Sequence, residues 1–179
     1  MDERVTLKPA CDSDIWIFER QAVDPETAGI FNWSGFRNLP EKKRRLAEDG
    51  MISTDDGCLI IWVKGEAAGT VSWRRVHYGM PMSSCWNIGI SVLPEHRGKG
   101  IGTRSQIELV RYLFDTSPVQ RIEAHTDVEN IPEQRALARI GFTQEGLLRS
   151  TQFREGYWRD MYLYGITRDD HLALDPSRS

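Results

Sequence analysis

The fold of this chain is decided by the stretch IGISVLPEHRGKGIGT, residues 88–103. An apolar segment passes through a glycine-rich basic turn into a segment with helical periodicity, where Ile107, Val110 and Phe114 recur at i, i+3 and i+7. Glycines let the backbone approach a ligand without interference from Cβ, and the unpaired N–H groups that begin a helix attract anions. The stretch therefore predicts a strand, a phosphate-binding turn and a helix.

The spacing of the glycines separates the known kinds of phosphate loop. A P-loop ends in Gly-Lys-Ser/Thr, whereas Lys99 is followed by Gly100. A dinucleotide-binding loop needs G-x-G-x-x-G, whereas Gly98, Gly100 and Gly102 alternate and position 105 is Ser105. Neither motif fits, and a β-to-α turn with solvated basic residues stays the alternative to a phosphate site.

A third pattern, Arg/Gln-x-x-Gly-x-Gly/Ala, is filled by Arg97, Gly100 and Gly102. The turn thereby resembles the acyl-CoA pyrophosphate loop of the GNAT superfamily of N-acetyltransferases. The resemblance implies acetyl-CoA as co-substrate, with its pyrophosphate on the turn and its thioester facing the backbone of the preceding strand. The cofactor-binding residues that it implies are Ile90, Val92, Arg97, Gly98, Lys99, Gly100, Ile101, Gly102 and Thr103.

A second motif follows the helix, where an alternating strand, residues 120–126, leads into DVENIPEQRALARIGF, residues 127–142. Pro132 suits the first turn of a helix and Gly141 its C′ position. This segment resembles the element that GNAT proteins place beside the pantetheine arm, and Asn130 stands eleven positions before Gly141 as that element requires. Asn130 is thus either a pantetheine ligand or a turn residue before a helix.

The C-terminal segments, residues 142–149 and 156–165, narrow the resemblance to the branch that contains the ribosomal-protein N-terminal acetyltransferases (RimJ/RimL type). The resemblance covers roughly residues 5 to 168. It implies an α/β fold, a single GNAT-like domain over residues 1–179. Its mixed, mostly antiparallel twisted sheet has about seven strands, is flanked by helices and splays between the fourth and fifth strands.

Local signals place the remaining elements. Strands are expected at residues 5–8, 58–63, 69–73 and 86–92, with Gly65 and Glu66 as a tight hairpin turn. One helix is expected to run through Arg20 after an N-cap at residues 12–14, and another to begin near Pro40. A long turn-rich segment, residues 24–39, lies between these helices.

Composition indicates an ordinary soluble enzyme. The net charge of −3 argues against a nucleic-acid partner, and no apolar run approaches the ~20 residues of a membrane span. Residues 1–4 lack a signal-peptide core, so we expect a cytoplasmic protein. Cys11, Cys58 and Cys85 are far apart and odd in number, which predicts buried free thiols with neither a disulfide nor a metal site.

A basic run, KKRR at residues 42–45, is surrounded by Glu41, Glu48 and Asp49. It is interpreted either as the solvated face of a short helix or as a contact to the 3′-phosphate of coenzyme A or to an acidic substrate surface.

Acetyl transfer to an amine sets clear chemical demands. A lysine-type ammonium of pKa near ~10, or an α-amino group near ~8, must lose a proton before it attacks the thioester. The oxyanion needs a donor, which the resemblance assigns to a backbone N–H near Val92. The leaving thiol has a pKa near ~8.5, so a general acid helps without being obligatory. The family's tyrosine falls at Leu137, the serine of several relatives at Glu133, and a strand carboxylate at Asn87.

Glu133 and Asp160 remain as catalytic candidates. Glu133 could contact the sulfur or orient a water, although a first-turn glutamate is also a common partner of the helix dipole. Asp160 could hold the substrate ammonium, or pair with Arg159 or Arg154. More distant helpers in deprotonation through water are His77, His125 and Asp127.

Aromatic residues in two segments are candidates for the acceptor site. Phe31 and Trp33, with Phe36, form either a lid over a substrate cleft or anchors of the early loop on the core. Tyr157 and Trp158 belong to the final hairpin, where the resemblance implies an acceptor pocket.

The leading hypothesis is an acetyl-CoA-dependent N-acetyltransferase that moves the acetyl group directly to a primary amine of a small molecule or a protein N-terminus. The enzyme would act as a monomer or homodimer. The alternative is a catalytically degenerate GNAT domain that binds acyl-CoA as a sensor or scaffold. Turnover with an amine separates the two.

Overall fold

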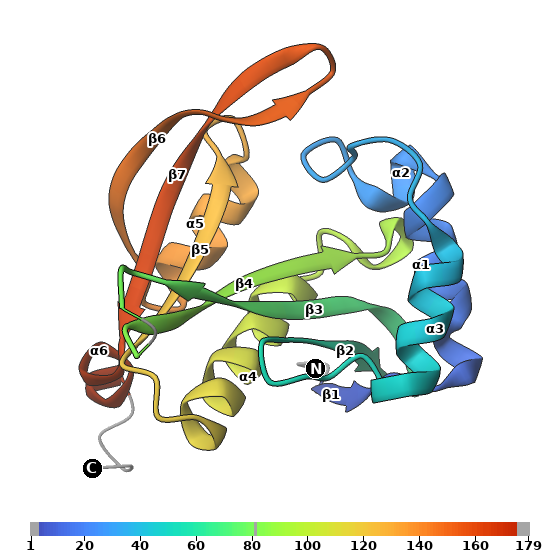
Figure 1. The fold of residues 1–179 in the computed structure, drawn as a ribbon, viewed down its shortest axis with the longest axis horizontal. Helices are drawn as coiled ribbons and strands as arrows, with labels where there is room; N and C mark the ends of the chain where they lie inside the picture. The colour runs from blue at the N-terminus through green and yellow to red at the C-terminus, as the bar shows by residue number, and fades with distance from the viewer. Residues whose placement is uncertain (1–3, 81, 175–179) are drawn as a thin grey trace.

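The computed structural model describes residues 4–80 and 82–174. Residues 1–3, part of the segment used above to predict that the chain has no signal peptide, lie outside the described residues. Seven strands form one sheet in the order β1-β2-β3-β4-β5-β7-β6. All neighbouring strands in it are antiparallel except β4 and β5, so the expected mixed, mostly antiparallel sheet is confirmed (Figure 1). The strands are β1 (Val5–Pro9), β2 (Asp56–Val63), β3 (Glu66–His77), β4 (Ser84–Val92), β5 (Arg121–Asp127), β6 (Thr143–Arg154) and β7 (Tyr157–Thr167).

The helices are α1 (Ile15–Val23), α2 (Pro25–Ala28), α3 (Leu39–Asp49), α4 (Ile101–Thr116), α5 (Ile131–Arg139) and α6 (Arg168–Leu174). Short 3-10 turns, η1 (Asp12–Asp14) and η2 (Pro94–His96), precede α1 and the turn before α4. Helix α2 lies in the segment expected to be turns only, and it forms because the Asp24 side chain accepts hydrogen bonds from the N–H groups of Glu26 and Thr27. Helix α6 was not expected.

The β2–β3 turn differs by one residue from the expected turn. It consists of Lys64 and Gly65, with φ of 52° and 83°, and Glu66 already pairs with Val63 in the sheet. Two consecutive positive φ angles are typical of a type I′ turn, whose twist suits a two-residue hairpin. The turn therefore begins one residue earlier than expected, at Lys64.

The two faces of the sheet are covered by different helices. Alternate strand residues such as Leu59, Val71 and Ile88 belong to one core cluster with residues of α4. Ile60 belongs to the other core cluster, together with Phe18 of α1 and Leu46 of α3. Because side chains alternate along a strand, residues 87, 89 and 91 of β4 face the α1–α3 side.

The sheet opens between β4 and β5, as expected. Their parallel ladder consists of Trp86–Ile122, Asn87–Glu123 and Ile88–Ala124. Beyond it β4 continues to Val92 beside β3, while β5 turns away with β7 and pairs with it to Asp127 (Figure 1). Residues 89–92 therefore form an edge of β4, here called the open edge, which no strand covers on the β5 side among the described residues.

The cysteines are free, as predicted, but only two are shielded from solvent. Cys85 is buried, Cys58 is half-buried and Cys11 is exposed, so the expectation of burial is wrong for Cys11. Its thiol lies in a turn, 3.1 Å from Asp14 Oδ2. Burial raises the pKa of Cys58 to about 11 and that of Cys85 to about 12.

None of the helices in the described ranges is long and apolar enough to cross a membrane.

Candidate active site

The turn before α4 presents a helix N-terminus that no side chain caps within the described part of the chain. Gly98 and Gly100 adopt φ of 74° and 70°, a left-handed conformation that glycine takes without steric cost. The first-turn N–H groups of Ile101, Gly102 and Thr103 cannot be satisfied inside the helix. Together with the helix dipole they make this turn a site for an anion.

The basic residues of the turn also brace it. Arg97 donates from Nε to the carbonyl oxygen of Val92 and from Nη2 to that of Thr27, both at 2.8 Å. Lys99 Nζ donates to the carbonyl oxygen of Glu95, also at 2.8 Å. Both positive charges stay on the exposed turn, and Arg97 ties it to α2. Their contact with a pyrophosphate stays a prediction.

Backbone groups on the open edge point into the gap. Leu93 N donates to the carbonyl oxygen of Ala68 at 2.9 Å, which directs the N–H of Leu93 toward β3. Since successive residues of a strand alternate, the N–H groups of Ile90 and Val92 point the other way, toward the space that β5 has left. A Cβ on Gly102 would lie 3.7 Å from both of these side chains, so the turn packs directly on the open edge.

Helix α5 borders the same opening from the α4 side. Asn130 is its N-cap and accepts a hydrogen bond from Glu133 N at 3.4 Å. Glu133 Oε1 accepts a hydrogen bond from Gln106 Nε2 of α4 at 2.5 Å. Burial raises the pKa of Glu133, while the bond from Gln106 opposes that rise. Leu137, where the family's tyrosine falls, is fully buried in the core.

A cleft of about 380 Å³ lies on the opposite face of the sheet. Its walls come from α1, the early loop after α2, α3 and strands β2 to β4, and its lining includes residues 87–91 of β4. The cleft thus reaches the open edge at Gly89 and Ile90. The anion site at α4 and the cleft approach this one edge from two faces of the sheet.

The structure places the predicted aromatic residues outside the lining of this cleft. Phe31 contacts β6 instead. Its carbonyl oxygen accepts a hydrogen bond from Gln152 Nε2 at 3.4 Å, and its ring lies 5.2 Å from the guanidinium carbon of Arg154. Trp33 packs edge-to-face on Phe36 at 5.6 Å. The early loop is therefore anchored to β6 through Phe31.

The β6–β7 hairpin carries the other two aromatic candidates at its tip. Tyr157 and Trp158 are 68% and 63% exposed, and Trp158 packs on Phe153 at 5.5 Å. Their predicted contact with an acceptor requires the acceptor to reach beyond the cleft.

Asp160 lies in the same hairpin and stabilises its bend. Its Oδ1 accepts a hydrogen bond from Ser150 N at 2.8 Å, next to a β-bulge where Ser150 has φ of 52°. The expected pairing of Asp160 with Arg154 is wrong, because Arg154 pairs with Asp127 at 2.8 Å. The pairing with Arg159 is wrong too, since that guanidinium faces Glu129 and Glu155.

His125 stands on β5 just past the last pair of the β4–β5 ladder, on the same face as the cleft. Burial lowers its pKa, so the imidazole is neutral at neutral pH and able to accept a proton. Arg74, which lines the cleft, adds to this lowering of the pKa, while Glu123 opposes it with Oε1 3.7 Å from His125 Nε2. The pKa of His125 is thus lowered by burial and adjusted further by charged groups at the opening.

Sequence reasoning missed most of the side chains that line the cleft, among them Arg37, Thr70 and Arg74. The basic run at residues 42–45 is solvated only in part, and its contact with a phosphate or an acidic substrate stays a prediction. Lys42 and Arg45, three positions apart on one face of α3, are half-buried in the cleft lining, whereas residues 43 and 44 are exposed. That three-residue spacing was the available signal, together with the alternation of polar residues 70, 72 and 74 along β3.

Comparison with known proteins accords with this geometry. A family model described as acetyltransferase (GNAT) domain matches residues 4–143. The uncharacterized N-acetyltransferase p20 of Bacillus licheniformis is 24% identical over 175 residues, 96% of this chain and 97% of that protein. The ribosomal-protein-serine acetyltransferase of Escherichia coli is 24% identical over 136 residues, 74% of each chain.

Among solved structures, the spermidine N-acetyltransferase from Vibrio cholerae in complex with CoA and spermine aligns with a TM-score of 0.81. Its sequence is 18% identical, and the alignment covers 94% of this chain and 98% of that one. The predicted fold, family and resemblance to the ribosomal-protein branch are confirmed. With its open strand edge, its uncapped helix turn and these relatives, the chain belongs to the GNAT family of acyl-CoA-dependent N-acetyltransferases.

Proposed function

We propose that this enzyme moves an acetyl group from acetyl-CoA directly to the primary amine of a small molecule or of a protein N-terminus. The observation that carries the proposal is the open edge of β4, which the anion site of α4 and the cleft reach from opposite faces. A thioester and an amine that approach one edge from two sides can react without a covalent enzyme intermediate.

The cysteine at the cleft supports direct transfer. Cys58 lines the cleft, but its raised pKa of about 11 keeps it a thiol at neutral pH. Since the thiolate is the nucleophile, Cys58 is a poor candidate for an acyl-enzyme.

Residues of the turn and the open edge fit the parts of acetyl-CoA, which supplies the thioester. The N–H groups of residues 101–103 and the charges of Arg97 and Lys99 would hold the pyrophosphate. The backbone of Ile90 and Val92 would bind the pantetheine arm as an added strand does, with Asn130 on its far side.

In the transfer step the amine nitrogen bonds to the acetyl carbon and the carbon–sulfur bond breaks. We assign His125, neutral and on the cleft face, or a water that it orients, to accept the proton of the ammonium. The N–H of Val92 would face the developing oxyanion. Glu133, with its raised pKa, is the candidate to protonate the thiolate from the α4 side. Asp160 is the weaker of the two catalytic candidates, because its Oδ1 already accepts a hydrogen bond from Ser150 N.

Thiol release from acetyl-CoA in the presence of primary amines, amino sugars, polyamines and N-terminal peptides tests the proposal. Amine-dependent release that is lost in Gly100→Trp supports it, since the indole blocks the turn. Binding of acetyl-CoA with silence across the panel would support a binding domain instead, and absence of binding would refute the cofactor assignment. We further propose a cytoplasmic monomer or homodimer, which gel filtration and cell fractionation test.

A further inference from the structure

We propose that the acceptor is a small anionic amine, in which a carboxylate or phosphate accompanies the primary amine. Its anionic group would be held by Arg37, Lys42 and Arg74 in the cleft. The inference rests on the proposed function, because it names the substrate class of the same site.

The cleft lining carries more positive than negative charge. Its cations are Arg37, Lys42, Arg45 and Arg74, and its one carboxylate among the described residues is Asp56. A concave surface with charge of one sign focuses the electrostatic field and concentrates ligands of the opposite sign.

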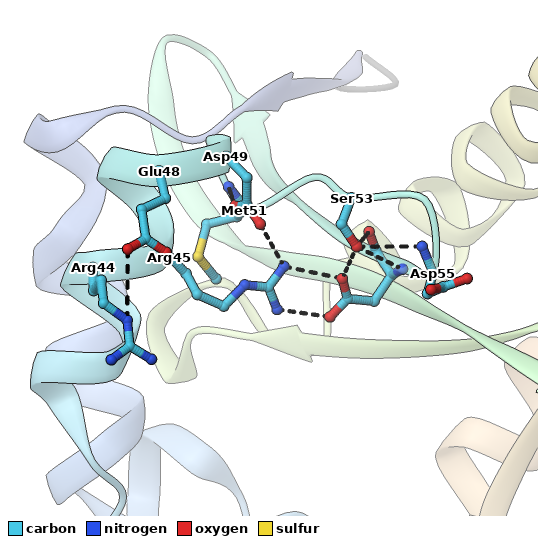
Figure 2. Close-up of polar contacts among 8 residues, drawn as sticks. Arg44, Arg45, Glu48, Asp49, Met51, Ser53 and Asp55 are labelled. Carbon is cyan, nitrogen blue, oxygen red and sulfur yellow. Dashed lines mark hydrogen bonds and ion pairs between the residues drawn. The ribbon is translucent and has the colours of Figure 1, made fainter.

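The one carboxylate is already neutralised. Arg45 donates to both oxygens of Asp56, at 2.6 Å and 3.0 Å, and Arg45 Nη2 also lies 3.3 Å from Asp49 (Figure 2). The pKa of Asp56 is lowered chiefly by the bond from Arg45, so the pair stays ionised at neutral pH. Asp56 is therefore unable to hold a substrate ammonium, and Arg45 adds no net charge.

The other three cations form no ion pair within the described residues, although Lys42 is close enough to Asp56 to help lower the pKa of that carboxyl. Within residues 4–80 and 82–174, no carboxylate lies within ion-pair distance of Arg37, Lys42 or Arg74. Arg37 donates to the carbonyl oxygen of Asn32 at 3.0 Å, and Arg74 to Asn87 Oδ1 at 3.4 Å. Both acceptors are neutral, so they satisfy hydrogen bonds without cancelling charge.

The outer face of α3 shows the opposite pattern. Lys43 Nζ lies 3.0 Å from Glu19 of α1. Arg44 Nε lies 3.8 Å from Glu48, on the side of the helix away from Arg45 (Figure 2). Cations on the solvent side are thus paired with carboxylates, although water would solvate them in any case. On the cleft side, Arg45 is paired with Asp49 and Asp56, whereas Lys42 forms no ion pair within the described residues and stays available to an anion from outside.

An orphaned donor in the cleft wall supports the same conclusion. Asn87 is 8% exposed, lines the cleft, and its Nδ2 has no hydrogen-bond partner within the described chain. A buried amide N–H without a partner costs free energy unless a ligand oxygen accepts from it. A carboxylate or phosphate oxygen beside Arg74 would do so.

The size of the cleft favours a small molecule over a polypeptide. A volume of about 380 Å³ lies at the lower end of the range for small-ligand sites, roughly 300 to 1,000 Å³. With the anion near Lys42 and Arg74, an amine a few bonds away would lie toward Gly89 and Ile90 on the open edge. A polyamine would bring further positive charge toward Arg37, Lys42 and Arg74, and these cations would repel it.

Matched pairs of amines test the proposal through kcat/KM. Phosphoethanolamine is compared with ethanolamine and phenylalanine with phenethylamine, and spermidine represents the polycations. We expect the anionic member of at least one pair to be preferred at least tenfold at low salt, with the ratio falling as salt increases. The pair that shows the preference distinguishes phosphate from carboxylate. Equal or better turnover of both partners that lack an anionic group, or of spermidine, would overturn the proposal.

Two substitutions connect the preference to the cleft. Lys42→Gln and Arg74→Gln should each raise the KM of the preferred anionic amine at least fivefold without changing the KM of acetyl-CoA. Lys43→Gln, on the outer face of the same helix, is the matched control and should change neither. If both cleft variants leave unchanged the ratio of kcat/KM for the anionic amine to that for its partner without an anionic group, the assignment is refuted.

Calorimetric binding of the anionic amines to the wild type and to Lys42→Gln in the presence of CoA separates the two proposals. Binding that Lys42→Gln weakens, in a protein that acetylates no amine, would support the anion site while the proposed function fails. Turnover of amines that lack an anionic group, without binding of any anionic amine, would do the reverse.

Discussion

The ion pair between Arg154 and Asp127 links the β6–β7 hairpin to the end of β5, and its removal gives the sharpest test of the structure. The two side chains are 5% and 1% exposed, and Arg154 Nη2 lies 2.8 Å from Asp127 Oδ2. The other carboxylate oxygen, Asp127 Oδ1, accepts a hydrogen bond from Glu129 N at 2.8 Å. Arg154→Met keeps an unbranched apolar stem in place of the aliphatic part of the arginine and leaves the buried carboxylate without a cation.

The distance and burial set the size of the effect. At 2.8 Å and an effective dielectric constant of about 20, the Coulomb attraction is roughly 6 kcal/mol. Desolvation of both ions offsets most of it, and removal of one partner of a buried pair costs about 3–5 kcal/mol. We expect Arg154→Met to lower the free energy of unfolding by about 3 kcal/mol. Asp127→Asn, which keeps an acceptor for Glu129 N, should have a similar effect.

Urea unfolding of the two single variants and the double variant measures the coupling, which we expect to be about 2 kcal/mol. Arg159→Met is the control in the same hairpin. Its nearest carboxylate oxygens are 3.9 Å away, so it should cost less than about 1 kcal/mol. Arg154→Met should also raise the KM of the acceptor amine more than that of acetyl-CoA, because the ring of Phe31 lies over this guanidinium. Additive single variants, or a loss below about 1 kcal/mol for Arg154→Met, would refute the reasoning.

Three further changes probe other parts of the molecule. Gly98 has φ of 74° and open space at Cβ, so Asp and Asn both fit there. The Gly98→Asp variant should bind acetyl-CoA roughly 30-fold more weakly than Gly98→Asn in calorimetry, because the added carboxylate repels the pyrophosphate by about 2 kcal/mol. Equal affinities of the two variants would contradict a pyrophosphate at this turn. Burial raises the pKa of Glu133, so the folded protein keeps this proton to a higher pH than the unfolded chain does. The wild type should therefore lose stability relative to Glu133→Gln as the pH rises above the ordinary pKa of 4.5. A difference in stability that does not depend on pH would contradict the raised pKa. The hydroxyl of Tyr78 donates to Glu123, which raises the pKa of Tyr78 to about 12. In unfolding measurements the contribution of this hydrogen bond to stability should be complete below pH 10 and disappear toward pH 12. Tyr78→Phe should lack this loss of stability at alkaline pH.

Local sequence was sufficient for the elements that bind the cofactor in our proposal. Positive φ at Gly98 and Gly100, the start of α4 directly after them, and Gly141 at the C′ position of α5 all follow from short-range preferences. The opening of the sheet between the fourth and fifth strands came from the resemblance to GNAT proteins. Composition alone would not have indicated it, since it depends on β5 following β7 instead of β4.

Tertiary structure alone decided what surrounds the acceptor. The cleft joins α1, α3, β3 and β4, and which side of α3 faces it determined that Lys42 enters while Lys43 pairs with Glu19 outside. Arg154 became a buried partner of Asp127, although the sequence had associated it with Asp160. The physical reason is range: a turn or a helix end is set by neighbours along the chain. The charge left in a cleft depends on which distant carboxylates packing brings within reach.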